Sequence, residues 1–148
     1  MSRVIHTERC GYPEVNLSWM VGRTVQAVSF NEPTLWVFSL GGAEHIAVQC
    51  LWRILRDGCI AMCSGDHGHP FGLPEPVNAQ RDATEWLSSS PVSAVKLIEG
   101  TADIVLDAGS VFRLEIISES IGYESWTIRG PEGVCYSAHG GRLCKWVE

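Results

Sequence analysis

The stretch that decides the fold is Ile46-Ala47-Val48-Gln49-Cys50-Leu51-Trp52-Arg53-Ile54, in which every second side chain is apolar. Strict alternation over this length is typical of a β-strand with one buried face. Two apolar segments, Val25–Val28 and Leu35–Phe38, precede it, and the turn Gly41-Gly42 separates them from it. This order predicts a strand, a hairpin and a second strand.

The same order of segments returns in the second half of the chain. Its members are Val92–Val95, Asp103–Leu106, the turn Asp107–Ser110 and the strand Val111–Ile117. A tryptophan accompanies each copy, Trp52 in the first and Trp126 in the second. We therefore predict a β-rich α+β fold, in which two duplicated β-hairpin units form a sandwich or a partly open barrel-like sheet with one covering helix.

Length and composition predict a single domain over residues 1–148. The internal repeat covers approximately 20–63 and 90–147, and a loop and helix over 64–89 join the copies. Hydrophobic residues make up 45% of the chain, as expected of a folded globular protein. The sequence has neither an apolar run of signal-peptide length at its start nor the roughly 20 apolar residues that span a bilayer. The predicted location is cytoplasmic, without a membrane partner.

Local signals place the turns and the helix. Asp57-Gly58 lies between two alternating runs and supplies the positive φ angles of a tight hairpin, so the strands beside it should pair. A helix is predicted over Ala79–Ser88 with Asn78 as its N-cap, and it should cover a sheet. The segment Ser64–Pro76 is predicted to be a long loop. The lead-in Met1–Leu17 is predicted to be irregular.

The last part of the chain is predicted to form three short strands. They are Tyr123–Ile128, Val134–His139 and Arg142–Val147, separated by the glycine-containing turns Gly130–Gly133 and Gly140-Gly141.

The net charge of −6 constrains the class of partner. Nucleic-acid binding requires clustered Lys and Arg, whereas the eleven basic residues here are scattered from Arg3 to Lys145. We therefore expect no nucleic-acid partner. An acidic surface can attract a basic protein, although a moderate net charge also simply keeps a small protein in solution.

Six cysteines without a secretion signal are expected to be reduced thiols. Cys50 lies in the apolar phase of its strand, and Cys135 and Cys144 lie among apolar residues of the final hairpin. Burial as small hydrophobic side chains accounts for these three cysteines without any chemistry.

One set of residues has the composition of a zinc site, namely Cys59, Cys63, His67 and His69. On the strand that leaves the Asp57-Gly58 turn, however, Cys59 and Cys63 would lie about 13 Å apart, whereas two sulfurs on one ion lie about 4 Å apart. We therefore predict neither a metal site nor a cofactor.

Polar residues gather in two further places. In the loop, Asp66, His67 and His69 could bind a metal or transfer protons, but a turn in which Asp66 accepts hydrogen bonds from backbone amides is favoured. A second group could supply carboxylates and an imidazole to one pocket: Glu115, Glu119, Tyr123, Glu124 and His139. No spacing links this group to a known mechanism, so no catalytic residue is assigned.

Several short segments together resemble a family of small uncharacterised bacterial proteins. They are Trp52-Arg53-Ile54, Asp66-His67-Gly68, Phe71-Gly72-Leu73-Pro74, Gly122-Tyr123-Glu124-Ser125-Trp126 and Gly140-Gly141. The Gly-Tyr-Glu-Ser-Trp segment is the most specific of them, and the resemblance extends from about Gly22 to the C-terminus. Cys59, Cys63 and His69 lie outside the pattern.

Small acidic proteins of this type resemble the immunity proteins of toxin–immunity systems, which bind and block one cognate toxin. The resemblance implies a cytoplasmic binding protein that inhibits a cognate, basic protein toxin. The implied contact residues are Asp66, His67, Glu119, Tyr123 and Glu124. The alternative is a small enzyme or a ligand- or metal-binding protein that uses the Asp66-His67-Gly68-His69 loop. The oligomeric state is left open.

Overall fold

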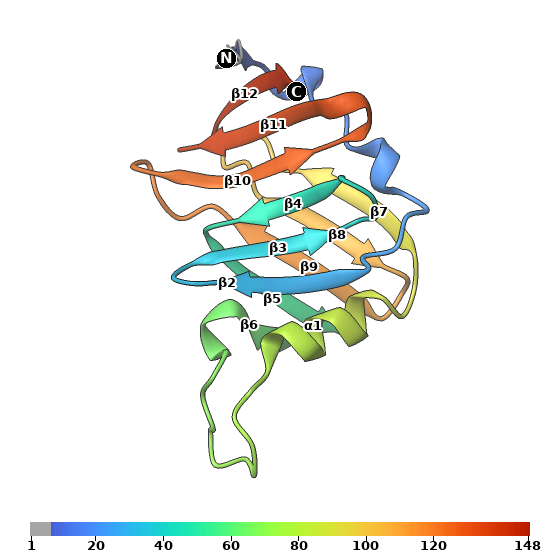
Figure 1. Ribbon diagram of the computed structural model, residues 1–148, viewed down its shortest axis with the longest axis vertical. Helices are drawn as coiled ribbons and strands as arrows, with labels where there is room; N and C mark the ends of the chain where they lie inside the picture. Colours follow the sequence, from blue (N-terminus) through green and yellow to red (C-terminus); the bar gives the residue numbers. More distant parts are fainter. Residues whose placement is uncertain (1–6) are drawn as a thin grey trace.

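The computed structural model describes residues 7–148 and contains two antiparallel sheets that pack as an open sandwich (Figure 1). The seven-stranded sheet has the order β1 (Glu8–Cys10), β12 (Arg142–Val147), β11 (Val134–His139), β10 (Glu124–Arg129), β4 (His45–Val48), β3 (Leu35–Ser39) and β2 (Ala27–Asn31). The five-stranded sheet has the order β6 (Cys59–Cys63), β5 (Leu51–Arg56), β9 (Phe112–Ile117), β8 (Ile104–Ala108) and β7 (Val92–Leu97). The predicted β-rich sandwich with one covering helix is confirmed.

The helical segments are short. They are α1 (Ala79–Leu87) and the 3₁₀ turns η1 (Tyr12–Glu14), η2 (Ser18–Met20), η3 (Ser64–Asp66) and η4 (Pro131–Gly133). Within residues 7–148, no helix is long and apolar enough to cross a membrane.

The two sheets exchange hairpins. The first unit forms the meander β2–β3–β4 in the seven-stranded sheet, and its hairpin β5–β6 then joins the other sheet beside β9. The second unit forms the meander β7–β8–β9 in the five-stranded sheet, and its hairpin β10–β11 crosses back to lie beside β4. Each sheet therefore contains strands of both units, and each unit supplies part of the one core between them.

The strand registers show that the two units are equivalent position by position. Trp52 lies opposite Ile116 in one sheet, and Trp126 lies opposite Val48 in the other. The next pairs in register repeat this relation and are Ile54 with Leu114 and Ile128 with Ile46. Trp52 and Trp126 are thus counterparts, and both are fully buried.

The alternating stretch 46–54 does not form the single strand that the sequence predicts. The chain leaves the seven-stranded sheet after Val48 and enters the five-stranded sheet at Leu51, so Gln49 and Cys50 form a crossover. Burial nevertheless alternates without interruption through Cys50, which is 5% exposed. Because both sheets face the same core, a strand can change sheets and keep its apolar face inward.

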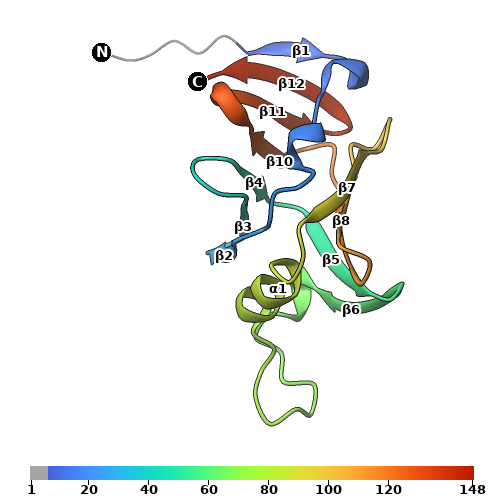
Figure 2. The same ribbon diagram turned by 90° about the vertical axis from the view of Figure 1, so that its right-hand side faces the viewer.

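The prediction of an irregular lead-in over Met1–Leu17 is wrong for Glu8–Cys10 and Tyr12–Glu14, which form β1 and η1. β1 pairs with β12 at the edge of the seven-stranded sheet and places Glu8 opposite Lys145 (Figure 2). The Tyr12 hydroxyl then donates a 2.6 Å hydrogen bond to the Gly141 carbonyl. A three-residue strand is too short to show alternation, so the sequence gives no signal for it. Residues 1–6 lie outside the described residues.

The predicted turns and helix are confirmed. Asp57 and Gly58 have φ angles of 50° and 81° and join the paired strands β5 and β6. The Asn78 side chain caps α1 by accepting a 3.0 Å hydrogen bond from the Arg81 amide. The three strands predicted at the end of the chain are β10, β11 and β12.

Helix α1 runs along a sheet edge and lies at the lower end of the sandwich in Figures 1 and 2. The Thr84 hydroxyl accepts a hydrogen bond from the Val28 amide, and the Gln80 side chain accepts one from the Phe30 amide, both at 2.9 Å. The Val28 and Phe30 amides point away from β3, where β2 has no neighbouring strand. Because the helix accepts their hydrogen bonds, this sheet edge is protected from pairing with another chain.

Candidate functional site

A hollow of about 400 Å³ opens between the short β2–β3 turn, the crossover at Gln49 and Cys50, and η3. We call it the aromatic pocket. Its lining includes Phe30, Trp36, His67 and Glu119. The segments that frame it lie on the left of Figure 1, above the long loop that follows η3.

Three rings converge on the pocket from different elements. Phe30 on β2 and Trp36 on β3 are cross-strand neighbours, and their ring centroids lie 4.6 Å apart. The His67 ring approaches Phe30 at 5.5 Å and Trp36 at 5.4 Å with its edge. Cross-strand aromatic pairs of this kind stabilise a sheet, and here they also provide an aromatic wall.

Glu119 contributes the carboxylate of the pocket. The Leu51 amide donates a 3.1 Å hydrogen bond to its Oε1, which fixes the carboxylate beside the crossover. Burial raises the pKa of the Cys50 thiol to about 12, and the charge of Glu119 acts in the same direction. Among the described residues, no Lys or Arg lines the pocket.

His67 is held in one neutral tautomer by the start of helix α1. The Ala79 amide donates a 3.0 Å hydrogen bond to its Nδ1, so the ring proton is on Nε2. A doubly protonated ring could not accept this bond. The half-buried imidazole therefore tethers the loop to the helix and adds no positive charge to the pocket.

Asp66 forms the predicted turn. Its Oδ2 accepts a 2.9 Å hydrogen bond from the Cys63 amide at the end of β6. Asp66 and His67 thus both accept structural backbone bonds, which favours a role in shaping the loop over acid–base chemistry.

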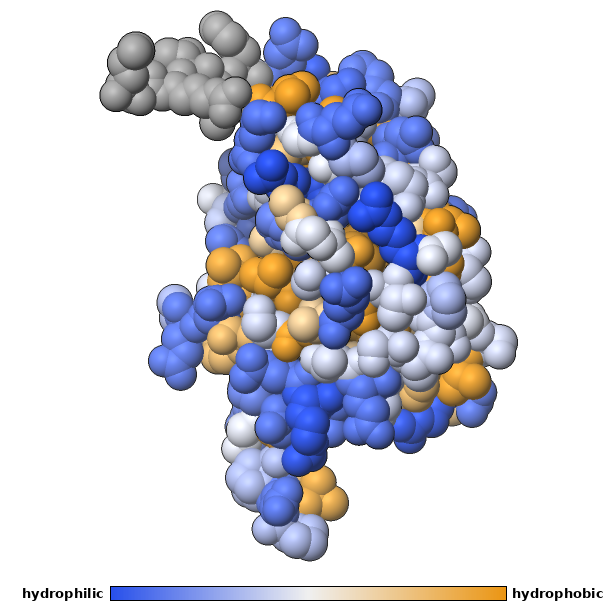
Figure 3. Space-filling view, turned by 45° about the vertical axis from the view of Figure 1, so that its right-hand side comes forward, coloured by the Kyte–Doolittle hydropathy of each residue, from blue (hydrophilic) through white to orange (hydrophobic). Residues whose placement is uncertain are grey.

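The loop over residues 67–78 protrudes from the sandwich (Figure 1). Its base is closed by hydrogen bonds from the Gly68 amide to the Val77 carbonyl at 2.8 Å and from the Val77 amide to the His69 carbonyl at 2.9 Å. Its tip exposes 64% of Phe71 and 55% of Leu73. Figure 3 shows hydrophobic surface on this protruding segment, which we call the loop tip.

The second predicted polar group does not gather in one pocket. Glu119 lines the aromatic pocket, whereas Glu115 pairs with Arg53 at 2.7 Å across the five-stranded sheet. Tyr123 is 47% exposed at the end of the crossover between β9 and β10. Glu124 lies opposite His139 at the start of β10 and accepts a hydrogen bond from the Thr127 hydroxyl. Of these residues only Glu124 and His139 are cross-strand neighbours, and Glu115 is held in an ion pair in the other sheet.

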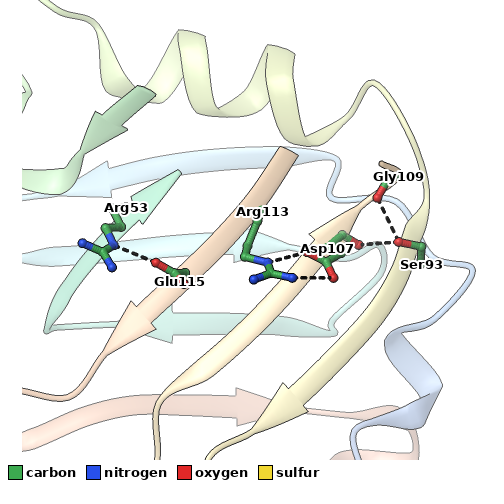
Figure 4. A network of polar contacts seen from close by, with 6 residues as sticks. All are labelled: Arg53, Ser93, Asp107, Gly109, Arg113 and Glu115. Carbon is green, nitrogen blue, oxygen red and sulfur yellow. Dashed lines mark hydrogen bonds and ion pairs between the residues drawn. The ribbon is translucent and has the colours of Figure 1, made fainter. Parts of the chain in front are cut away.

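The polar network in Figure 4 belongs to the five-stranded sheet and has a structural role. Arg113 donates a 2.7 Å hydrogen bond to Asp107, which raises the pKa of the guanidinium. The Ser93 hydroxyl donates to the carbonyls of Asp107 and Gly109, where β7 departs from regular pairing. About half of the Arg113 side chain is exposed, and such pairs contribute little to stability.

The cysteine and histidine residues with the composition of a zinc site do not converge. Cys59 and Cys63 occupy the two ends of β6, as the hairpin predicted. Within residues 7–148 there is no group of three or more His, Cys, Asp or Glu side chains that could hold a metal ion. The six cysteines are free thiols, and Cys50 and Cys135 are buried.

No protein-family model, curated protein or solved structure matches the chain. In the segment Gly122–Trp126, which carries the resemblance, Ser125 and Trp126 are fully buried and Tyr123 and Glu124 are exposed. Packing thus accounts for the second half of the segment, and its first half is free to contact a partner.

Sequence reasoning missed Phe30, Trp36 and Gln49 as pocket residues. A signal was present in the repeat itself, because the register counterparts of Phe30 and Trp36 in the second unit are the aliphatic residues Leu97 and Ile104. An aromatic pair in only one of two equivalent units indicates a local requirement that the shared core does not impose.

Proposed function

We propose that the protein is a binding protein of immunity type, which blocks a basic protein partner through the surface around its protruding loop. The observation that carries the proposal is the loop tip, where Phe71 and Leu73 are exposed on a segment that is closed at its base. Large apolar side chains on a protruding segment are typical anchors of protein interfaces.

The loop is suited to binding because it is restrained before a partner arrives. Pro70, Pro74 and Pro76 fix three backbone angles, and the ring of His69 stacks on Phe71 at 5.4 Å. A restrained loop loses less conformational entropy on association than a flexible one. This supports Phe71 and Leu73 as the apolar centre of the interface.

Charge supports a basic partner. The net charge of −6 attracts a positively charged protein and speeds its encounter. Glu119 lies at the pocket above the loop, and Tyr123 and Glu124 lie exposed near the start of β10. In the proposal these three form the polar part of the contact surface, whereas Asp66 and His67 act by holding the loop in shape.

The test is capture of the partner from the cells in which the chain occurs, with the tagged chain as bait. The proposal predicts one basic protein at near-equal amount, which arrests growth when produced alone and is neutralised when the chain is produced with it. The double variant Phe71→Ala, Leu73→Ala should weaken binding at least about 30-fold, because each anchor side chain is lost.

The matched control is Val147→Ala, which removes an exposed apolar side chain at the opposite end of the molecule. It should leave the affinity unchanged. Equal weakening by both variants, or a captured protein that is acidic and harmless, would contradict the proposal. Conversion of a small molecule by the chain alone would favour the enzyme alternative.

A further inference from the structure

In the second unit, the place that corresponds to the aromatic pocket is also hollow, with a volume of about 350 Å³, but no aromatic side chain lines it. The turn between β7 and β8 spans residues 98–103, and its Ala102 is completely buried. The Trp126 indole donates a 2.7 Å hydrogen bond from Nε1 to the Ala102 carbonyl. Ala102 is thus part of the core at this end of the sandwich. Its carbonyl accepts the hydrogen bond of the buried Trp126 indole.

In the first unit the counterpart of this buried alanine is exposed. The turn between β2 and β3 spans only residues 32–34, and register makes the exposed Thr34 the counterpart of Ala102. The Nε1 atom of Trp52, the counterpart of Trp126, is buried without a hydrogen-bond partner within residues 7–148. The aromatic pocket lies beside this shortened turn, with Thr34 in its lining. The two corresponding hollows therefore differ in their lining, because aromatic rings line only the one in the first unit.

The lining of the pocket indicates which chemical group would fill it. The rings of Phe30 and Trp36 line the pocket, and the π system of an aromatic ring attracts a cation. Glu119 adds a carboxylate whose position is fixed by the Leu51 amide. His67 is neutral, and no Lys or Arg of the described chain lines the pocket to compensate the charge. An aromatic wall with one uncompensated carboxylate favours a positively charged ligand group.

We propose that the aromatic pocket binds the guanidinium group of an arginine side chain that the basic partner inserts. Arginine fits better than lysine, because its planar guanidinium stacks on aromatic rings and donates paired hydrogen bonds to a carboxylate. A volume of about 400 Å³ accommodates one such side chain. The identity of the arginine's carrier rests on the proposed function, whereas the recognition of guanidinium rests on the pocket alone.

The test uses Nα-acetyl-arginine amide as the probe, measured by titration calorimetry at low salt on the full chain. Nα-acetyl-citrulline amide is the matched neutral probe, since it has nearly the same shape and no charge. The arginine probe should bind with 1:1 stoichiometry and on the order of tenfold more tightly than the citrulline probe. Raising the salt concentration should narrow this difference.

Two variants locate the binding. Glu119→Gln should reduce the affinity for the arginine probe about five- to tenfold, whereas Glu99→Gln, at an exposed glutamate of the β7–β8 turn, should not change it. Phe30→Leu installs the residue found at the equivalent position of the second unit and should also weaken binding severalfold. Unchanged far-ultraviolet circular dichroism would show that the variants remain folded.

Equal binding of the two probes, no binding of either, or equal effects of the two glutamate variants would overturn the proposal. Free L-arginine that binds far more tightly than the blocked probe would also overturn it, because the site would then recognise a free amino acid. Failure of the pocket proposal can be distinguished from failure of the proposed function. A captured partner that is insensitive to Glu119→Gln removes only the pocket proposal, and arginine binding without any captured partner removes only the proposed function.

Discussion

The two units of this protein share their strands and differ in their connections. Both begin with a three-stranded meander and send a hairpin into the opposite sheet, and their buried tryptophans occupy the same register position. The first unit crosses between sheets through Gln49 and Cys50 alone, whereas the second uses residues 118–123 and exposes 90% of Ile121. The first unit has the short turn and the aromatic pocket. The second has the long turn, the buried Ala102 and a hollow of about 350 Å³ without aromatic lining.

The comparison separates what the core requires from what it does not. Positions that face the core keep large apolar side chains in both units, because a closely packed interior tolerates neither voids nor excess volume. Phe71 and Leu73 lie on the loop 67–78, and Glu119 and Tyr123 lie on the crossover 118–123, which is longer than its counterpart in the first unit. Function is therefore best sought where the two units differ.

The largest effect is expected from removing either tryptophan. Trp52→Ala and Trp126→Ala should each lower the free energy of unfolding by about 3–5 kcal/mol, because each leaves a large cavity in the shared core. Chemical denaturation followed by circular dichroism would measure this. A loss below 1 kcal/mol for only one of the two would break the equivalence of the units.

A subtler substitution should distinguish the two tryptophans. Phenylalanine removes the indole Nε1, which is paired to Ala102 in Trp126 and unpaired in Trp52. Trp126→Phe should therefore be more destabilising than Trp52→Phe by about 1–2 kcal/mol, since it leaves the Ala102 carbonyl buried without a donor. The same denaturation experiment compares them, and a reversed order would contradict the assignment of the Ala102 carbonyl as the acceptor for Trp126.

The tight crossover should give a measurable pH dependence. The Cys50 pKa is about 12 in the folded protein, above its value of about 8.5 in an unfolded chain, so the folded state binds this proton more tightly. The buried neutral thiol makes its full contribution to the free energy of unfolding below about pH 8.5. This contribution falls as the pH rises toward 12. Between pH 9 and 10 the loss should be about 1 kcal/mol, and Cys50→Ala should remove it. An identical pH dependence in the variant would show that other groups cause it.

The smallest effect on stability is expected at the loop tip. Phe71→Ala with Leu73→Ala should change the free energy of unfolding by less than about 0.5 kcal/mol, because both side chains are already exposed. The same change is predicted to weaken partner binding at least about 30-fold. A large loss of stability would show that the loop tip packs against the sandwich and is not a free contact surface.

The repeat and its turns could be predicted from sequence because they depend on local patterns. The equivalence of Trp52 and Trp126, the hairpin at Asp57-Gly58 and the cap at Asn78 all follow from alternation and short-range chemistry. The exchange of hairpins could not be predicted, since burial alternates through Gln49 and Cys50 as it would in one straight strand.

The candidate site was harder to predict because tertiary contacts determine it. Asp66 accepts its hydrogen bond from an amide three residues away, which local reasoning anticipated. His67 accepts from the Ala79 amide twelve residues away, and Glu119 from the Leu51 amide of the other unit. That aromatic rings line only one of two corresponding hollows can be recognised only once the strand registers are known.

The most direct test is the indole region of the proton–nitrogen NMR spectrum during titration with Nα-acetyl-arginine amide. The signals of Trp36 and Trp52 should shift together with the Leu51 amide, because these groups lie in or beside the open pocket of the first unit. The Trp126 indole, bonded to the Ala102 carbonyl in the second unit, should not move. Shifts of all three indoles alike, or of none, would contradict the account.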